Sequence, residues 1–145
     1  MNILSNVSKN LKDLMEEAEI TAQKLAAELD TDPSVISKFL RAERLPSADT
    51  LVTLADYFNC TTDYILGLSD LLDNRTFKSR PPFNEQLTFL LDYFKVTKYG
   101  LSKATGISEE AIGRWHSGKF EPTVESLVKI ARHYSCSVDF LLGRE

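Results

Sequence analysis

Apolar residues in the first part of the chain recur every three to four positions, a spacing that is typical of amphipathic helices. Leu11, Leu14, Met15 and Ala18 form one such face. Three further faces follow, made by Leu25, Ala26 and Leu29, by Ile36, Phe39 and Leu40, and by Leu51, Leu54, Ala55 and Phe58. No stretch alternates apolar and polar residues for long enough to predict a strand. The pattern therefore predicts an all-α fold made of short helices.

Residues that start helices lie between these faces. Thr21 offers a capping hydroxyl, and Asp32-Pro33 combines a capping carboxylate with a proline suited to the first helical position. Pro46-Ser47 opens a fourth helix, and either Thr61 or Thr62 caps a short fifth one. Five helices are therefore expected before residue 68.

The same arrangement occurs twice, because residues 76 positions apart match without a gap. Pro46 pairs with Pro122 at this offset, and Gly67 pairs with Gly143. Other identical pairs are Leu11 and Leu87, Leu14 and Leu90, Thr21 and Thr97, Leu25 and Leu101, Ile36 and Ile112, and Cys60 and Cys136. The expected caps of the second copy are Thr97, Ser108, Thr123 and Ser137. Each copy is a unit of roughly 60 residues, a size that folds alone with marginal stability.

The predicted boundaries are residues 1–67 for the first domain, 68–83 for a linker and 84–145 for the second domain. The middle of the linker is poor in helix or strand signals, since it contains Asn74, Lys78, Ser79, Arg80, Pro81 and Pro82. Its two consecutive prolines are expected to stiffen the entry to the second domain. Fully extended, its 16 residues would span about 50 Å.

The gap between the second and third predicted helices is very short in both copies. It is Asp30-Thr31 in the first copy and Gly106-Ile107 in the second. A sharp turn between nearly perpendicular helices needs a residue with positive φ, which glycine adopts freely and aspartate tolerates. Two helices joined in this way form a helix-turn-helix, whose second helix fits the major groove of DNA.

Further motifs surround these turns. In the first copy they are Thr21, Leu25-Ala26, Val35-Ile36-Ser37-Lys38-Phe39, Pro46-Ser47, Thr50-Leu51 and Asp63-Tyr64-Ile65-Leu66-Gly67. In the second copy they are Thr97, Leu101-Ser102, Gly106-Ile107-Ser108, Ile112-Gly113-Arg114-Trp115, Gly118-Lys119, Pro122-Thr123 and Asp139-Phe140-Leu141-Leu142-Gly143. With these motifs, each copy resembles a Cro/CI-type (phage-repressor-like, XRE-type) helix-turn-helix domain. The resemblance implies two tandem five-helix, lambda-repressor-like, DNA-binding domains in a transcriptional regulator.

The chain departs from the pattern of that family at two positions. The family often carries Gln after the threonine that starts the second helix, where this chain has Ala22 and Lys98. The usual glycine after the recognition helix is Ala42 in the first copy and Gly118 in the second. The first change removes a phosphate ligand from the first copy, and neither change threatens the fold.

The resemblance makes the third helix of each copy a recognition helix. Ile36 and Phe39 are expected to point inward, as are their equivalents in the second copy, which leaves the polar residues outward. The residues predicted to read base edges are Ser34, Ser37, Lys38, Glu110, Gly113 and Arg114. Lysine and arginine suit guanine O6 and N7, glutamate can accept from cytosine N4, and serine is permissive. Lys38 and Arg114 occupy equivalent positions and are the foremost candidates.

A second set is predicted to bind phosphates, contacts that position a domain without reading sequence. It consists of Thr21, Gln23, Arg41, Arg44, Thr97, Lys98, Ser117 and Lys119. The helix N-termini near Thr21, Thr97 and Ser108 also offer amides to phosphate. Glu109 and Glu110 have a second interpretation, as acids that favour the dipole at the start of their helix. In that role they would weaken DNA binding by repelling phosphates.

Composition narrows the function classes. Apolar residues make up 43% and charged residues 26%, the balance of a globular protein. No run of about 18 apolar residues and no signal peptide are present, so we expect a cytoplasmic protein with no membrane partner. The net charge of −4 argues against indiscriminate coating of nucleic acid. The charge is uneven, at −6 for residues 1–76 and +2 for residues 77–145.

Nothing in the sequence points to catalysis, a cofactor or a metal. Cys60 and Cys136 give neither a disulfide framework nor a metal-finger spacing, and both are expected to be buried thiols. His116 and His133 lack companion ligands, and neither a glycine-rich phosphate loop nor a nucleophile motif is present. We therefore expect a non-enzyme. Phe120 replaces Arg44 at a loop position and is expected to pack on the linker or to contact a partner.

Three functions are compatible with these features. In the first, two recognition helices bind non-identical half-sites in adjacent major grooves of double-stranded DNA, and the protein represses transcription. In the second, one copy binds DNA and the other is a homodimerisation or protein-interaction module. Its interface would be formed by the aromatics of the second copy and the Glu109-Glu110 pair; the aromatics are Phe89, Tyr93, Phe94 and Phe120. In the third, the protein is an anti-repressor-type adaptor that does not bind DNA, which its acidic charge would suit.

Overall fold

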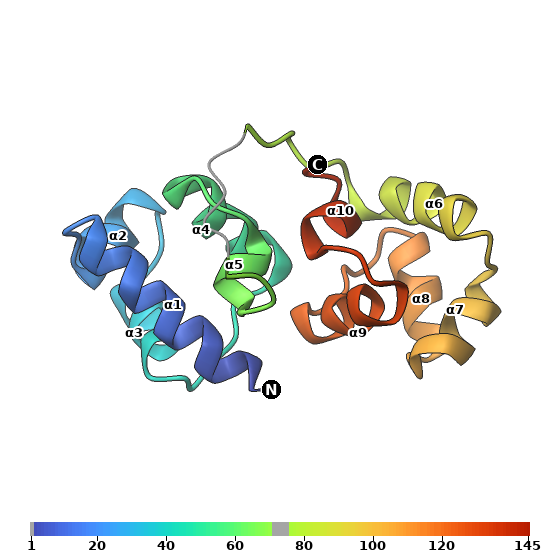
Figure 1. Ribbon diagram of the computed structural model, residues 1–145, viewed down its shortest axis with the longest axis horizontal. Coiled ribbons are helices and arrows are strands. Elements are labelled where there is room, and N and C mark those ends of the chain that lie inside the picture. The colour runs from blue at the N-terminus through green and yellow to red at the C-terminus, as the bar shows by residue number, and fades with distance from the viewer. Residues whose placement is uncertain (1, 71–75) are drawn as a thin grey trace. The chain divides into compact units, whose positions relative to one another are not determined.

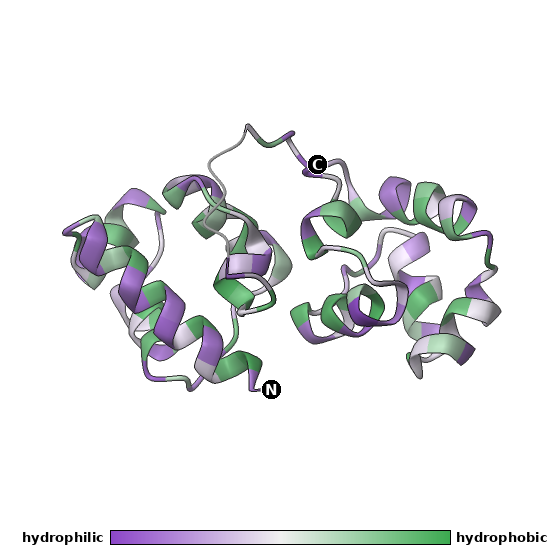
Figure 2. Ribbon diagram, viewed as in Figure 1, coloured by the Kyte–Doolittle hydropathy of each residue, from purple (hydrophilic) through white to green (hydrophobic). Residues whose placement is uncertain are grey.

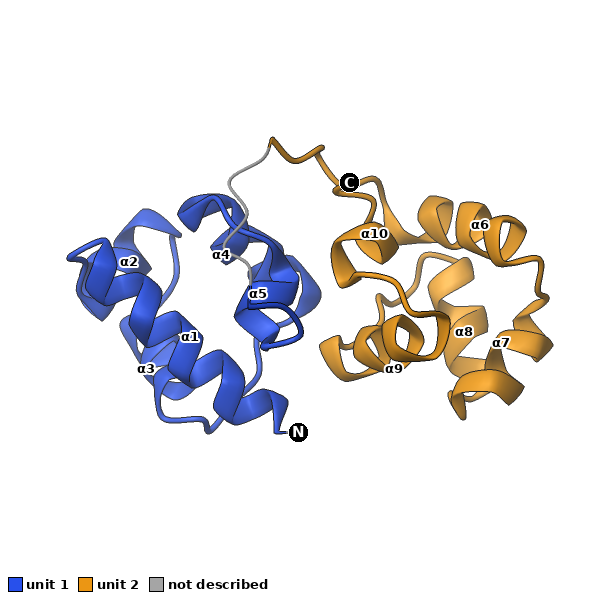
Figure 3. Ribbon diagram, viewed as in Figure 1, with its two compact units in different colours: residues 1–75 blue, residues 76–145 orange. Residues whose placement is uncertain are grey.

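The fold is all-α, as predicted. The computed structural model describes residues 2–70 and 76–145, and within these ranges it contains ten helices and no strand (Figure 1). The chain divides into two compact units, residues 1–75 and 76–145, each with five helices in its described part (Figure 3). In unit 1 the helices are α1 (Ile3–Glu17), α2 (Ala22–Glu28), α3 (Pro33–Leu40), α4 (Ala48–Phe58) and α5 (Thr62–Leu66). In unit 2 they are α6 (Phe83–Phe94), α7 (Lys98–Thr105), α8 (Glu109–His116), α9 (Val124–Tyr134) and α10 (Val138–Leu142).

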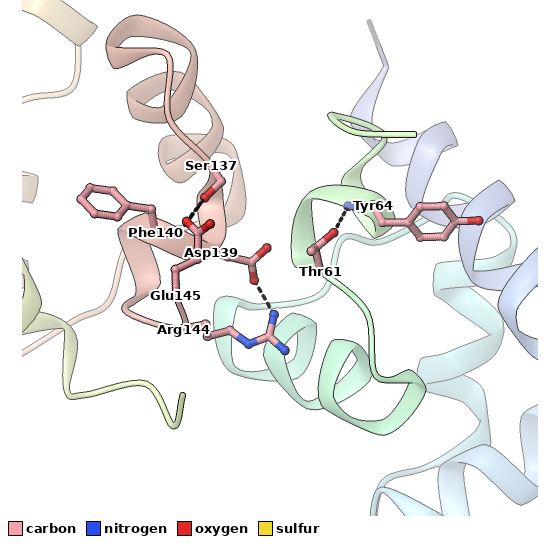
Figure 4. Close-up of polar contacts among 7 residues, drawn as sticks. All are labelled: Thr61, Tyr64, Ser137, Asp139, Phe140, Arg144 and Glu145. Carbon is pink, nitrogen blue, oxygen red and sulfur yellow. Dashed lines mark hydrogen bonds and ion pairs between the residues drawn. The ribbon is translucent and has the colours of Figure 1, made fainter. Parts of the chain in front are cut away.

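Polar side chains cap most of these helices at the predicted positions. The capping residues are Thr21, Asp32, Ser47 and Thr61 in unit 1, and Thr97, Ser108, Thr123 and Ser137 in unit 2. Of the two candidates for α5, Thr61 is the cap, because its hydroxyl accepts from the Tyr64 amide at 2.9 Å (Figure 4). Each cap satisfies one of the amides that a helix start leaves without a partner.

The repeat extends to the left-handed turns of the backbone. Positive-φ residues in the described part of unit 1 are Glu19, Asp30, Ala42, Asn59 and Gly67. Those in unit 2 are Lys95, Gly106, Gly118, Ser135 and Gly143, each 76 positions later. Because these residues set where each helix stops and where the chain turns, their recurrence indicates that both units follow the same path.

Each helix carries hydrophobic residues on one side and hydrophilic residues on the other (Figure 2). In unit 1 the core contains Leu11 of α1, Leu25 of α2, Ile36 of α3 and Leu51 of α4, all fully buried. In unit 2 the core contains Leu87, Ile112, Leu127 and Leu141, together with Trp115, whose ring makes an edge-to-face contact with Phe83. These faces match the apolar spacing in the sequence.

The first helix of each unit is hydrogen-bonded to its last. The Asn10 side-chain amide donates to the Tyr64 carbonyl at 2.9 Å, and the Gln86 amide donates to the Phe140 carbonyl at 3.1 Å. Asn10 and Gln86 are equivalent, as are the two acceptors. Each acceptor carbonyl also accepts the amide of the glycine that ends its helix, Gly67 or Gly143, so the side-chain amide adds a second bond that ties the first helix of the unit to the last.

The described residues 77–83 of the predicted linker pack as part of unit 2. Phe83 is the first residue of α6 and is only 2% exposed. The Lys78 amide donates to the Arg144 carbonyl at 2.8 Å, and Arg80 pairs with Glu121 at 2.6 Å. A Cβ atom at Gly143 would lie 2.6 Å from Pro81 Cδ. Asn74, also assigned to the linker, lies outside the described residues.

A buried ion pair anchors this segment. Arg144 is fully buried, its guanidinium donates to the fully buried carboxylate of Asp139 (Figure 4), and its Cζ lies 4.2 Å from the centre of the Phe77 ring. A buried charge needs a partner because it has lost its hydration. Unit 1 has Leu68 at the position equivalent to Arg144 and therefore has no matching pair there.

The two cysteines differ in exposure. Cys60 is buried, as predicted, whereas Cys136 is half-buried, so the prediction of a buried thiol is wrong for the second copy. Cys136 follows the left-handed Ser135 and lies beside Tyr134, where the surface is hollowed. The local pattern predicted an apolar position but not the hollow in the surface, which leaves the side chain partly accessible.

We expect Arg144→Met to destabilise unit 2 by about 3–5 kcal/mol, because it leaves the Asp139 carboxylate buried without its cation. Urea unfolding followed by the fluorescence of Trp115, the chain's single tryptophan, measures unit 2 selectively. Lys129→Met, at an exposed position of α9, is the control and should change stability by less than about 0.5 kcal/mol. Equal, small effects of both variants would show that the buried pair is not needed.

The residue after the C-cap of α3 and of α8 allows a reciprocal test. Ala42 has φ 57°, which is strained for a residue with a Cβ, whereas its equivalent Gly118 has φ 80°. Ala42→Gly should therefore stabilise unit 1 by about 0.5–1 kcal/mol, and Gly118→Ala should destabilise unit 2 by about 1–2 kcal/mol. Thermal unfolding followed by circular dichroism and by Trp115 fluorescence measures the two effects. Shifts of the same sign would contradict the assignment of backbone strain.

Candidate nucleic-acid interface

Each unit contains a helix, a tight turn and a second helix. In unit 1, α2 and α3 are joined through Asp30, whose φ is 55°, and the Thr31 amide donates to the Ala26 carbonyl at 2.9 Å. In unit 2, α7 and α8 are joined through Gly106, whose φ is 78° and whose amide donates to the Ser102 carbonyl at 2.8 Å. The predicted helix-turn-helix is present in both units.

The second helix of each motif has one buried side. In α3, Ile36 and Phe39 are buried, while Ser34, Lys38 and Arg41 are exposed and Ser37 is half-buried. In α8, Ile112 and Trp115 are buried, while Glu110, Arg114 and Ser117 (its C-cap) are exposed and Gly113 is half-buried. The candidate base-reading residues of each unit therefore share one accessible face, and their contact with bases stays a prediction.

An ion pair engages one of the candidate cations of unit 1. Arg41 Nε lies 2.5 Å from Glu43 Oε2, and both side chains are more than half exposed. The hydrogen bond from Arg41 lowers the pKa of Glu43, so the carboxylate stays charged at neutral pH. At the other end of α3, the Ser34 amide donates to the capping carboxylate of Asp32 and lowers its pKa. The cationic face of unit 1 is thus flanked by two carboxylates.

Arg114 of unit 2 lies between a carboxylate and an aromatic ring. Its Nη2 donates to Glu110 Oε1 at 2.5 Å, one helical turn earlier. Its Cζ lies 5.8 Å from the centre of the Phe120 ring, which belongs to the loop after α8. Glu110 therefore binds the arginine that shares its face, in addition to lying in the first turn of α8, where an acid favours the helix dipole.

The candidate phosphate ligands lie at the starts of α2 and α7 and after α3 and α8. Thr21 and Thr97 are exposed, and their hydroxyls already accept the Lys24 and Gly100 amides. Lys98 is half-buried, and its Nζ lies 3.2 Å from His116 Nδ1. The remaining candidates are all exposed; they are Gln23, Arg41, Arg44, Ser117 and Lys119.

Two residues near this face, Glu43 and His116, were missed as functional candidates. Glu43 is two residues from Arg41 in the sequence, and this short separation could have predicted their ion pair. His116 contacts Lys98 across two helices, and Thr88 Oγ1 lies 3.4 Å from its Nε2, so only the fold brings these residues together. Phe120 is predicted to pack on the linker or to contact a partner; the centre of its ring lies 5.8 Å from Arg114 Cζ, and contact with a partner stays a prediction.

No group of three or more His, Cys, Asp or Glu side chains in residues 2–70 and 76–145 is arranged to hold a metal ion. No helix within the same ranges is long and apolar enough to cross a membrane.

The two motifs define a helix-turn-helix protein, and sequence comparison agrees. The family model for helix-turn-helix proteins, HTH_3, matches residues 11–65 and 94–141, which is more than half of the chain. The chain belongs to this XRE-type helix-turn-helix family. No solved structure shows a significant match.

Two relatives are transcriptional regulators by name. The chain is 31% identical over 88 residues to the HTH-type transcriptional regulator ImmR of Bacillus subtilis (strain 168), an alignment that covers 60% of this chain and 69% of ImmR. It is 38% identical over 63 residues to the HTH-type transcriptional activator BcrR of Enterococcus faecalis, which covers 43% of this chain but only 31% of BcrR.

Removal of the carboxylate beside Arg41 should strengthen DNA binding. In Glu43→Gln, Arg41 no longer has to break an ion pair before it can bind a phosphate. The repulsion between the Glu43 carboxylate and the DNA phosphates is also lost. The affinity for DNA at low salt should therefore rise by up to about fivefold. Fluorescence anisotropy with a labelled duplex measures the effect. Asp13→Asn on α1 changes the net charge equally, away from the recognition helix, and should leave affinity nearly unchanged. Equal gains in both variants would attribute the effect to net charge alone.

Proposed function

We propose that this protein is a DNA-binding transcriptional regulator, in which α3 and α8 enter the major groove at two half-sites and block transcription from the promoter that contains them. The carrying observation is the presence of two helix-turn-helix motifs, each with its second helix buried on one side and polar on the other. Membership of the family and the names of the two relatives support regulation of transcription. Repression is the simplest outcome of occupying a promoter.

The proposed division of labour follows the chemistry of each face. Lys38 and Arg114 lie at equivalent positions and suit guanine O6 and N7. Ser34, Ser37, Glu110 and Gly113 complete the base-reading sets. The phosphate ligands are those at the helix starts and in the following loops, which fix the register of each helix in its groove. Because the two sets differ, the preferred half-sites should differ in sequence.

A second candidate function is favoured by the surface of unit 2. Glu109 and Glu110 place two exposed carboxylates on α8, and Glu110 neutralises Arg114. Large aromatic side chains are exposed elsewhere on the unit; they are Phe89, Tyr93 and Tyr99. In this alternative only unit 1 binds DNA, and unit 2 binds a second copy or another protein.

Site selection from random duplexes with the full chain tests both functions. Lys38→Ala and Arg114→Ala should each weaken binding to the selected site by roughly 1–3 kcal/mol and relax sequence preference only at their own half-site. Lys9→Ala on α1, whose side chain is 78% exposed, is the control and should leave preference unchanged. An effect of Lys38→Ala without any effect of Arg114→Ala would favour the second function. Failure to enrich any sequence over random DNA at moderate salt would refute DNA reading altogether.

A further inference from the structure

Phe120 is an exposed aromatic residue at the tip of the loop that follows α8. This residue is 59% exposed, although burial of an apolar ring away from water is favourable. Its equivalent in unit 1 is Arg44, so the position is apolar in one unit and cationic in the other. The repeat therefore singles out Phe120 as a feature that the common fold does not require.

The loop holds Phe120 in a defined place. The amides of Lys119 and Phe120 both donate to the Arg114 carbonyl, at 3.1 and 3.3 Å. The next residue, Glu121, pairs with Arg80 at 2.6 Å, and the Arg80 side chain is only 10% exposed. A loop whose backbone is held on both sides of Phe120 loses little conformational freedom when the residue binds, which favours a role in recognition.

Phe120 and Glu110 flank Arg114. The guanidinium is bonded to the Glu110 carboxylate on one side and lies 5.8 Å from the Phe120 ring on the other. Both groups therefore bias the direction of the arginine before any ligand arrives. An arginine oriented in advance makes two parallel hydrogen bonds at a smaller entropic cost.

We propose that Arg114 and Phe120 together read two neighbouring bases, a guanine and a thymine. This inference rests on the proposed function, since it requires α8 to lie in the major groove. Arg114 donates to guanine O6 and N7, and the Phe120 ring packs against the thymine 5-methyl group, the apolar feature of that groove. The 5.8 Å separation lies between one and two base-pair rises of about 3.4 Å, so the two side chains reach adjacent or nearly adjacent pairs.

This assignment separates unit 2 from unit 1. At the same loop position Arg44 supplies a charge, which attracts phosphate at any sequence. Phe120 supplies no charge, so its contribution to binding depends on an apolar partner. Unit 2 would thus compensate for its two carboxylates on α8 with a contact that discriminates between bases.

The test replaces single thymines by deoxyuridine in the duplex selected by the full chain. Uracil pairs like thymine but lacks the 5-methyl group, so only the apolar contact changes. For the wild-type protein, one thymine near the guanine read by Arg114 should be sensitive, with affinity falling about fourfold, the value expected for one buried methyl group. Phe120→Ala should bind more weakly and should no longer distinguish thymine from uracil, whereas Phe120→Leu should retain part of the discrimination.

Arg44→Ala is the matched control. It should weaken binding to all sequences alike, reduce the salt dependence by about one phosphate, and leave the thymine–uracil ratio of the unit 2 half-site unchanged. Trp115 fluorescence and circular dichroism verify that each variant is folded.

Three results would overturn the inference. The first concerns the guanine whose preference is lost in Arg114→Ala: no thymine beside it in the selected site is sensitive to loss of its methyl group. Another is a thymine–uracil ratio that persists in Phe120→Ala, which would assign the ring to a sugar contact or to packing. In both cases DNA reading, and hence the proposed function, would stand. Failure of the wild type to select any sequence would remove both proposals together.

Discussion

Burial of two side chains one turn apart on the second helix of each helix-turn-helix motif is the constraint on which the rest of the structure depends. Ile36 with Phe39 in α3, and Ile112 with Trp115 in α8, pack into the core of their unit. Residues three apart lie on one face of a helix, so burial of the pair turns the opposite face outward. The left-handed residue in the preceding turn then sets the angle at which this face is presented. Lys38 and Arg114 owe their shared accessibility to this arrangement.

The helices, their caps and the turns were predictable because each depends on residues close in sequence. Asp32-Pro33 specifies a helix start through one side-chain hydrogen bond and one fixed φ angle, and α3 begins there. Gly106 and Asp30 similarly predict a left-handed turn from their own backbone preferences. The 76-residue offset strengthened each of these predictions, since a signal weak in one copy recurs in the other.

Features that depend on distant residues could not be predicted in this way. Two prolines and several polar residues predict that residues 77–82 form no helix, and they form none. This pattern does not predict whether the segment packs on a domain. It packs because Arg144 is buried against Phe77 and Asp139. Arg144 and Phe77 are 67 positions apart in the sequence. The contact of Lys98 with His116 is of the same kind. For the candidate site, the sequence predicted which side chains are outward but not which acids neutralise them.

The exposed face of α3 and α8, with the loop that follows each, is one of the places where the two units differ in sequence. Ser34, Lys38 and Arg44 of unit 1 correspond to Glu110, Arg114 and Phe120 of unit 2, while the buried pair and the turns recur. In a symmetric dimer both recognition helices are identical, and the preferred site is a palindrome. A covalent pair has no such requirement, because each unit has its own side chains and the second contact is made at a high effective concentration. The divergence of these three positions, beside a buried pair and turns that recur, is the expected result if the two units read different half-sites.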